Sequence, residues 1–200
     1  MGPLHFDVPQ TPAQPTPPGA ATTTLDGYRA PRWLPGGHLQ TIWAARIARP
    51  LSGPPPVWRR ERWTTPDGDF IDVDFADGPP GAPWLVMLHG LEGSSQGHYA
   101  LAFAEAATRR GYTFAVPHFR GCSGELNLAP RAYHSGDYEE VGWMLQRLRQ
   151  RAGSLLRVVG ISLGGNALLR WGQEAGDTAA DIAQAVAAVC SPLDLAAAGR

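Results

Sequence analysis

The stretch that decides the fold is "LLRVVGISLGGNALLRW", Leu155–Trp171. An apolar, β-branched run leads directly into Ser162, and a segment with helical periodicity leaves directly after it. Gly160 and Gly164 stand two residues before and two residues after this serine, which completes the pattern G-x-S-x-G. A strand and a helix that meet in so sharp a turn need small residues there. The stretch predicts a nucleophile elbow with Ser162 as the nucleophile of an acyl transfer.

A second pentapeptide, "GSSQG" at 93–97, fits the same pattern but lacks the same surroundings. The apolar run Trp84–Leu88 ends at "HG", and a polar loop separates it from the next helical pattern. We therefore predict that Ser95 is a turn or helix-capping residue. The loop has another expected role, because acyl transfer needs two N–H donors for the oxyanion. We predict that these are the backbone N–H groups of Leu91 and Leu163.

The chain from Val57 onward alternates between strand and helix patterns. Two runs around "PDG" predict an antiparallel hairpin, and four later apolar runs predict further strands. The first two of these four, "WLVMLHG" and "YTFAVP", are of the buried parallel type. Helical patterns separate these runs, with Leu101, Ala104 and Ala107 on the expected inner face of the first. The order predicts an α/β fold whose mostly parallel sheet has helices on both faces. Five predicted strands precede Ser162, and three precede Ser95.

The first 56 residues differ in composition from the rest. Residues 1–27 are rich in proline and are predicted to form a disordered leader. Residues 28–56 are predicted to form an N-terminal segment with a short amphipathic helix. Its apolar positions at helical spacing are Leu39, Ile42, Trp43 and Ile47.

Composition excludes several classes of function. The net charge is −1, which gives no electrostatic basis for binding nucleic acid or an anionic membrane surface. All 17 basic residues are arginine, as is typical of a GC-rich bacterial genome. Cys122 and Cys190 stand outside any metal-ligand spacing, so we expect no cofactor and a reducing, cytoplasmic setting. We find no signal peptide and no apolar stretch long enough to cross a bilayer.

Five blocks in order carry a family resemblance: "GHLQTIW", "HGLEGSS", "HFRGCSGELN", "YHSGD" and "GISLGGNALLRW". With them the chain resembles the YheT-like branch of the α/β-hydrolase family. The resemblance implies a carboxylic ester hydrolase that acts on short- or medium-chain acyl esters or on lipids. It implies that Ser162 is the nucleophile, Leu91 an oxyanion donor and His89 a scaffold residue. Residues 57–200 are then the N-terminal part of an α/β-hydrolase domain, without its last strands.

The "HFRGCSGELN" and "YHSGD" blocks contain further polar residues. Arg120 and Glu125 are expected to make structural ion pairs or turns, with a role in shaping the pocket as the alternative. Cys122 is expected to be a small packed residue, and His134 a loop hydrogen-bonding residue.

The general base is missing from the expected place. In this family the order is serine, acid, histidine, yet all six histidines precede Ser162. Relatives continue for about another hundred residues that supply a lid, the acid and the base. We therefore expect the acid and the base beyond Arg200. Two weaker alternatives are His89 as a substitute base and Asp194 as the acid.

Three functional hypotheses remain open from the sequence. The first is a serine ester hydrolase whose substrate is a small-molecule ester or a lipid. The second is an acyltransferase of the same fold, which passes the acyl group to an alcohol or a thiol. The third is a truncated remnant or binding module without catalysis. The sequence specifies neither the acyl and alcohol parts of the substrate nor the oligomeric state.

Overall fold

The computed structural model describes residues 31–47 and 53–198 of the 200-residue chain. The chain divides into two compact units, Met1–Arg46 and Ile47–Arg200. The predicted leader, residues 1–27, lies outside the described residues. The domain boundaries at residues 28 and 57 stay predictions.

The first unit contains the short helix that the sequence predicts. The helix α1 spans Gly37–Ile42 and continues into a π-helical segment, η1, at Trp43–Ile47. Gly36 precedes the helix with φ 79°, a conformation that suits glycine. Leu39 and Ile42, two of the apolar positions of this helix, have exposed side chains.

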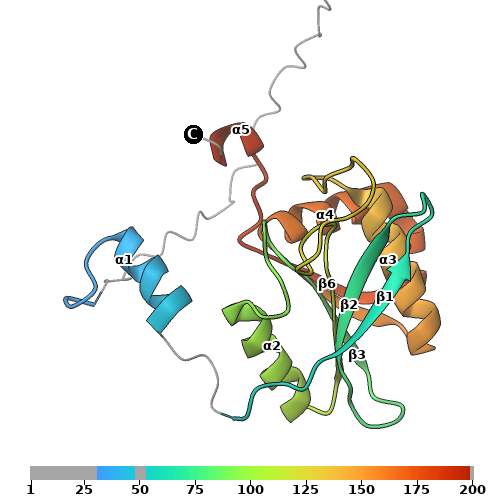
Figure 1. The fold of residues 1–200 in the computed structure, drawn as a ribbon, viewed down its shortest axis with the longest axis horizontal. Helices are drawn as coiled ribbons and strands as arrows, with labels where there is room; N and C mark the ends of the chain where they lie inside the picture. The colour runs from blue at the N-terminus through green and yellow to red at the C-terminus, as the bar shows by residue number, and fades with distance from the viewer. Residues whose placement is uncertain (1–30, 48–52, 199–200) are drawn as a thin grey trace, which may run out of the picture. The chain divides into compact units, whose positions relative to one another are not determined.

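The second unit is built on a six-stranded sheet with the order β1-β2-β4-β3-β5-β6 (Figure 1). β1 pairs antiparallel with β2 and β2 antiparallel with β4, whereas β4, β3, β5 and β6 are parallel. The predicted hairpin and the mostly parallel sheet are therefore confirmed. The strands are β1 Arg59–Thr64, β2 Phe70–Ala76, β3 Trp84–Leu88, β4 Thr113–Pro117, β5 Leu156–Ile161 and β6 Ala183–Val189.

Helices cover both faces of the sheet, as predicted. On one face α2 packs its buried alanines against a core that includes Phe114. On the other face α3 and α4 pack with a larger core that includes Met144 and Trp171. The inner face of α2 differs slightly from the prediction, because Ala100 is buried and Leu101 only half-buried. The helices are α2 His98–Arg109, α3 Tyr138–Ala152, α4 Leu163–Ala175, the 3₁₀ segment η2 Gly176–Asp181 and α5 Leu195–Ala198.

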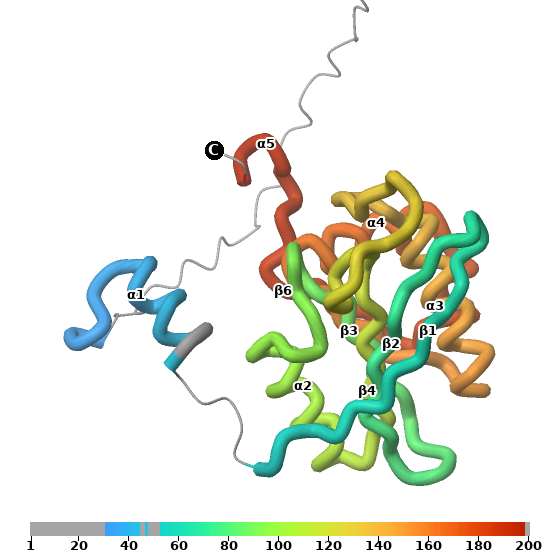
Figure 2. The backbone as a smooth tube through the Cα atoms, in the orientation of Figure 1, coloured from blue at the N-terminus to red at the C-terminus, as the bar shows by residue number. Residues whose placement is uncertain are grey.

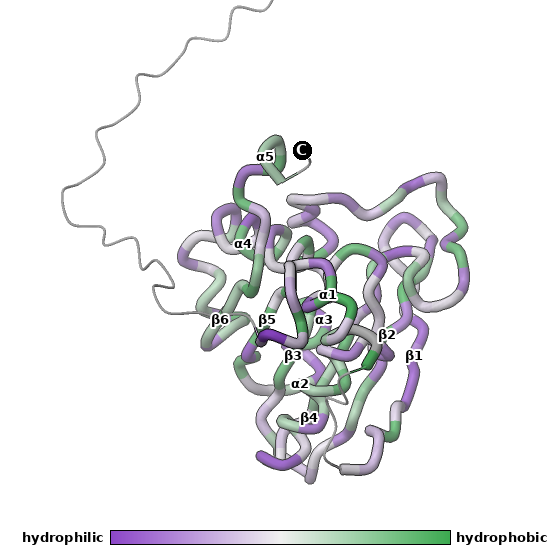
Figure 3. Tube along the Cα trace, turned by 90° about the vertical axis from the view of Figure 1, so that its left-hand side faces the viewer, coloured by the Kyte–Doolittle hydropathy of each residue, from purple (hydrophilic) through white to green (hydrophobic). Residues whose placement is uncertain are grey.

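The two edges of the sheet differ in chemistry. One edge strand of the sheet is β1, which is teal in Figure 2, and the other is β6, near the red end of the colour scale. β1 carries the sequence "RRERWT" and is mostly purple, that is hydrophilic, in Figure 3. β6 carries "AQAVAAV", has no charged residue, and is exposed at every position after Ala183.

Candidate active site

Ser162 is the single residue between β5 and α4. Its φ of 51° and ψ of −116° form a strained backbone conformation that residues with a Cβ rarely adopt. Its N–H donates to the Val189 carbonyl of β6 at 2.8 Å, and its carbonyl accepts the Asn166 N–H at 3.0 Å to begin the helix. The half-buried serine thus stands at the carboxyl end of β5 and at the positive end of the α4 dipole.

Three glycines make this turn possible. A Cβ on Gly160 would lie 2.5 Å from the Cα of Gly165, and one on Gly164 would lie 2.4 Å from the His89 carbonyl oxygen. A Cβ on Gly165 would lie 2.8 Å from the Gly160 carbonyl oxygen. These contacts are with backbone, which cannot move aside as a flexible side chain can. The close approach that the spacing predicts at Gly160 and Gly164 is present.

The loop after β3 reaches the same point. A Cβ on Gly90 would lie 3.3 Å from the Cβ of Ser162 and 3.9 Å from its Oγ. The next N–H, that of Leu91, has no hydrogen-bond acceptor in the part of the chain that the structure describes. Leu163 is the first residue of α4, where a helical N–H has no partner within the helix. The fold therefore brings both predicted oxyanion donors to the two segments that flank Ser162.

His89 is buried and neutral. Burial lowers its pKa to about 4, although its hydrogen bond with the Gly90 carbonyl acts in the opposite direction. Its Nε2 accepts the Phe119 N–H at 3.0 Å, and its Nδ1 lies 2.7 Å from the Gly90 carbonyl oxygen. Both ring nitrogens are thus occupied by backbone groups, which fits a scaffold residue and leaves no lone pair for Ser162.

Of the two roles predicted for Ser95, the structure shows the turn and not the helix cap. Gly97 holds the N-cap position of α2, which has no side-chain cap. Ser95 lies in a turn, fully buried, and its hydroxyl donates to Asp74. Its N–H donates to Nε2 of the buried His118 at 3.2 Å. The burial results from β2 and β4, which are distant in sequence, so the local pattern did not reveal it.

Asp74 and His118 complete this buried network. Burial acts to raise the pKa of Asp74, but hydrogen bonds from Arg60 and Ser95 outweigh it and hold the pKa below its usual value. Burial lowers the pKa of His118, whose Nδ1 lies 3.0 Å from the Asp72 carbonyl oxygen. His118 was not identified from the sequence as a partner of Ser95. The network is structural, because each of its polar groups is held by another part of the fold.

The expected structural role of Arg120 agrees with its contacts. Its buried guanidinium donates to Glu140 at 2.7 Å, Asp67 at 2.8 Å and Asp69 at 3.0 Å. Glu125 instead pairs with Arg62 of β1 at 2.6 Å and is exposed. Arg120 and Glu125 of the loop after β4 therefore both form ion pairs with the β1–β2 hairpin and hold the loop against it.

The remaining two residues of these blocks also have structural contacts. Cys122 is half-buried and packs against the larger core. His134 is exposed, and its Nδ1 lies 2.8 Å from the Ser135 carbonyl oxygen.

The described residues supply no base for Ser162. The Ser162 hydroxyl has no hydrogen bond to any described side chain. Asp194, the weaker candidate for the acid, is exposed and accepts the Ala197 N–H at 2.8 Å at the start of α5. Its carboxylate therefore caps a short helix.

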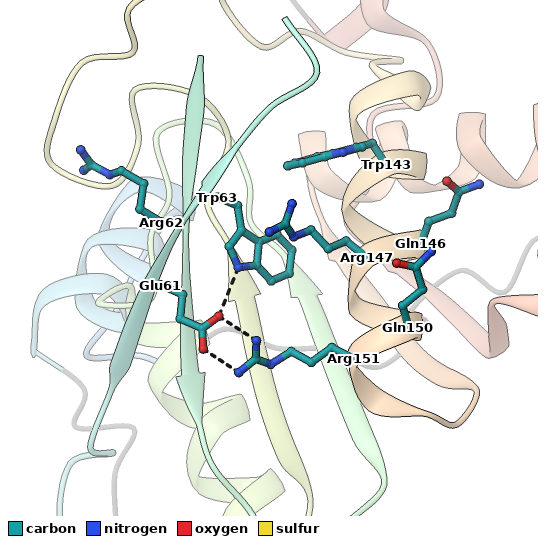
Figure 4. A pocket seen from close by; sticks show the side chains of 8 residues that line it. All are labelled: Glu61, Arg62, Trp63, Trp143, Gln146, Arg147, Gln150 and Arg151. Atoms are coloured by element: carbon teal, nitrogen blue, oxygen red, sulfur yellow. Dashed lines mark hydrogen bonds and ion pairs between the residues drawn. The ribbon is translucent and has the colours of Figure 1, made fainter. Parts of the chain in front are cut away.

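A cavity of about 800 Å³ lies away from the elbow, between β1 and α3 (Figure 4). Its lining carboxylate, Glu61, is held by Arg151 at 2.6 Å and by the Trp63 indole N–H at 3.2 Å. The guanidinium of Arg147 lies 4.6 Å from the centre of the Trp63 ring. No residue of the two pentapeptides lines this cavity. It contains neither a serine nor a histidine, so it is not the site of the predicted acyl transfer.

Comparison with known proteins agrees with this geometry. A family model described as alpha/beta hydrolase fold matches residues 83–199, which include both pentapeptides. The chain belongs to the alpha/beta hydrolase fold family. Within this hydrolase family, the chain is 45% identical over 135 residues to the putative esterase YheT of Escherichia coli, which supports the YheT-like branch. It is also 35% identical over 119 residues to a medium-chain fatty acid ethyl ester synthase/esterase 2 of Saccharomyces cerevisiae.

The matches cover only part of each relative. They include 66% of this chain and 39% of the E. coli protein, and 56% of this chain and 25% of the yeast protein. The solved structure of esterase Est22 superposes with a TM-score of 0.53 at 21% identity, over 69% of this chain and 44% of Est22. The chain therefore spans less than half the length of these hydrolase-family relatives. No helix among the described residues is long and apolar enough to cross a membrane.

Proposed function

We propose that the protein is a serine hydrolase of carboxylic esters, with Ser162 as its nucleophile. The observation that carries the proposal is the strained backbone of Ser162 between β5 and α4, with φ 51° and a glycine packed on each side. A fold tolerates such strain where it exposes a reactive group. The name of the E. coli relative, a putative esterase, agrees with this chemistry.

In the proposed reaction the Ser162 Oγ attacks the acyl carbonyl, the alcohol leaves, and water releases the acid from the acyl-enzyme. The N–H groups of Leu91 and Leu163 stabilise the oxyanion of each tetrahedral intermediate. The substrate is a small-molecule ester or a lipid. The base and acid that move the protons are not among the described residues that contact Ser162. The two unpaired cysteines agree with a cytoplasmic setting.

A fluorophosphonate probe tests the proposal, because it reacts with an activated serine to form a stable adduct. The protein is expressed from its complete gene, since the described residues do not supply the base. We expect one labelled site, lost in Ser162→Ala, together with hydrolysis of p-nitrophenyl butyrate or octanoate. A folded protein that neither reacts with the probe nor hydrolyses any ester of this series would contradict the proposal.

An acyltransferase is the second candidate. The printed name of the yeast relative includes ester synthase as well as esterase, so one protein of this similarity joins acyl groups to an alcohol. The two functions share the acyl-enzyme and differ in the group that attacks it. Product analysis with an ester in the presence of ethanol distinguishes them: a free acid indicates hydrolysis, and an excess of the ethyl ester indicates transfer.

A further inference from the structure

Two of three consecutive N–H groups in the loop after β3 are bound by tyrosine hydroxyls, and the one between them is not. The Gly90 N–H donates to the Tyr99 hydroxyl at 3.2 Å, and the Glu92 N–H donates to the Tyr133 hydroxyl at 2.7 Å. The Leu91 N–H between them has no acceptor among the described residues. Two tyrosine side chains thus bind the neighbours of the proposed oxyanion donor and leave the donor itself free.

Tyr133 restrains a strained part of the loop. Glu92 has φ 53°, a left-handed conformation that is unfavourable for a residue with a side chain. Its N–H is held there by a tyrosine whose ring stacks on Phe119 with a centroid distance of 5.2 Å. Burial raises the pKa of Tyr133 to about 12, so the hydroxyl that accepts the Glu92 N–H stays protonated.

Tyr99 restrains the loop from the opposite side. It belongs to the first turn of α2, and its side chain is half-buried. A Cβ on Gly93 would lie only 2.3 Å from the Tyr99 hydroxyl oxygen. This contact explains why position 93 is a glycine: any side chain would displace the hydroxyl from the Gly90 N–H. The Gly93 N–H in turn donates to the Gly90 carbonyl at 3.0 Å, which closes the turn around Leu91.

We propose that Tyr99 and Tyr133 are positioning residues that hold the Leu91 N–H in place as an oxyanion donor. The proposal rests on the proposed serine hydrolase function and adds to it the groups that orient one donor. Each tyrosine hydroxyl holds the N–H of a neighbouring residue, Gly90 or Glu92, in one direction. The loop therefore cannot rotate to present that N–H to the oxyanion in place of the Leu91 N–H. Misplaced donors lose most of their effect on a transition state, since this effect depends on a preorganised position.

The test compares Tyr133→Phe, Tyr99→Phe and the double variant with the wild type, all expressed from the complete gene. Each change keeps the ring and removes the hydroxyl. We expect kcat for p-nitrophenyl butyrate to fall about tenfold in each single variant, less than the roughly 10²–10³ that follows loss of a donor. KM should change less than about twofold, because both hydroxyls are bound to backbone N–H groups of the loop. The inhibition constant of a trifluoromethyl ketone, which forms a tetrahedral adduct, should rise by the same factor by which kcat falls.

Tyr112→Phe is the matched control, because Tyr112 is also half-buried but contacts Arg157 at the opposite end of the sheet. It should leave kcat unchanged. If the wild type is labelled at Ser162 and the tyrosine variants have the kcat and inhibitor affinity of Tyr112→Phe, the positioning role is wrong and the hydrolase function stands. A wild type without labelling at Ser162 overturns both proposals.

Amide hydrogen exchange tests the arrangement without relying on activity or on the stability of a variant. In the wild type the amides of Gly90 and Glu92 should exchange at least about tenfold more slowly than that of Leu91, after correction for intrinsic rates. A Leu91 amide as well protected as its two neighbours would show that this donor is not free, and would overturn the proposal.

Discussion

The two G-x-S-x-G pentapeptides are alike in sequence and opposite in structure. Ser162 is strained, half-buried and without a hydrogen bond from its hydroxyl to a described side chain. Ser95 is fully buried in an ordinary turn, and its hydroxyl is bound to Asp74. A serine can act as a nucleophile only if its hydroxyl is free to meet a base and a substrate. The difference lies in what surrounds the motif, and four measurements test it.

The largest effect is expected from Ser162→Ala, which removes the proposed nucleophile. Ester hydrolysis should fall by at least about 10⁴-fold, because the remaining oxyanion donors give only residual catalysis. The unfolding midpoint in urea should stay close to the wild-type value. Steady-state kinetics and fluorophosphonate labelling measure the loss. Residual activity above about 1% of the wild-type rate would show that another residue is the nucleophile.

The next effect is expected from Gly164→Ala, which changes the turn without removing the serine. The new Cβ would lie 2.4 Å and 2.5 Å from the carbonyl oxygens of His89 and Leu88. Since both contacts are with backbone, we expect a loss of about 3 kcal/mol in the free energy of unfolding. Urea denaturation measures it.

Gly172→Ala is the matched control for this change. Gly172 belongs to the same helix, and a Cβ there meets no atom within 4 Å. This variant should be as stable as the wild type or more stable by up to about 1 kcal/mol, because alanine favours the helix. Equal losses in both variants would contradict the close packing of the elbow.

Lower pH should destabilise the folded protein through His89, which lies in the loop that contains the 93–97 pentapeptide. Its folded-state pKa of about 4 lies below the ordinary value near 6.5, so the unfolded chain binds more protons between these two pH values. The free energy of unfolding should therefore fall as the pH is lowered from about 6.5 to about 4, by roughly 3 kcal/mol from this group alone. Urea titrations at several pH values measure the slope, and His89→Asn should reduce it. A stability independent of pH over this interval would argue against a buried neutral histidine.

The smallest effect is expected from Ser95→Ala. It removes one hydrogen bond to the buried Asp74, which keeps its contact with Arg60, so we expect a loss of about 1–2 kcal/mol. Fluorophosphonate labelling of Ser162 should persist. Ser94→Ala is the control, because that hydroxyl accepts only a 3.3 Å hydrogen bond from the Gln96 N–H. If Ser95→Ala abolished labelling in a protein that stays folded, the assignment of the two serines would need to be reversed.

Much of the fold and the elbow was predictable because the signals are local. Strand, serine and helix follow one another within Leu155–Trp171, and the hairpin turn lies within a few residues. The surroundings of Ser95 were not predictable, since Asp74 of β2 and His118, which directly follows β4, are 21 and 23 residues away. The same holds for Tyr133, which meets Glu92 across 41 residues. A pattern of period two or 3.6 specifies which face is buried, but not which polar groups meet across the fold.

The composition of β6 also has a practical consequence for handling the protein. Among the described residues β6 is an edge strand of alanine, valine and one glutamine, and an uncovered edge of this kind can pair with other extended segments. At the other side of the sheet, the arginines of β1 discourage such pairing. If the 200-residue chain is prepared by itself, we expect concentrated samples to self-associate through β6, and Val186→Lys should reduce this association.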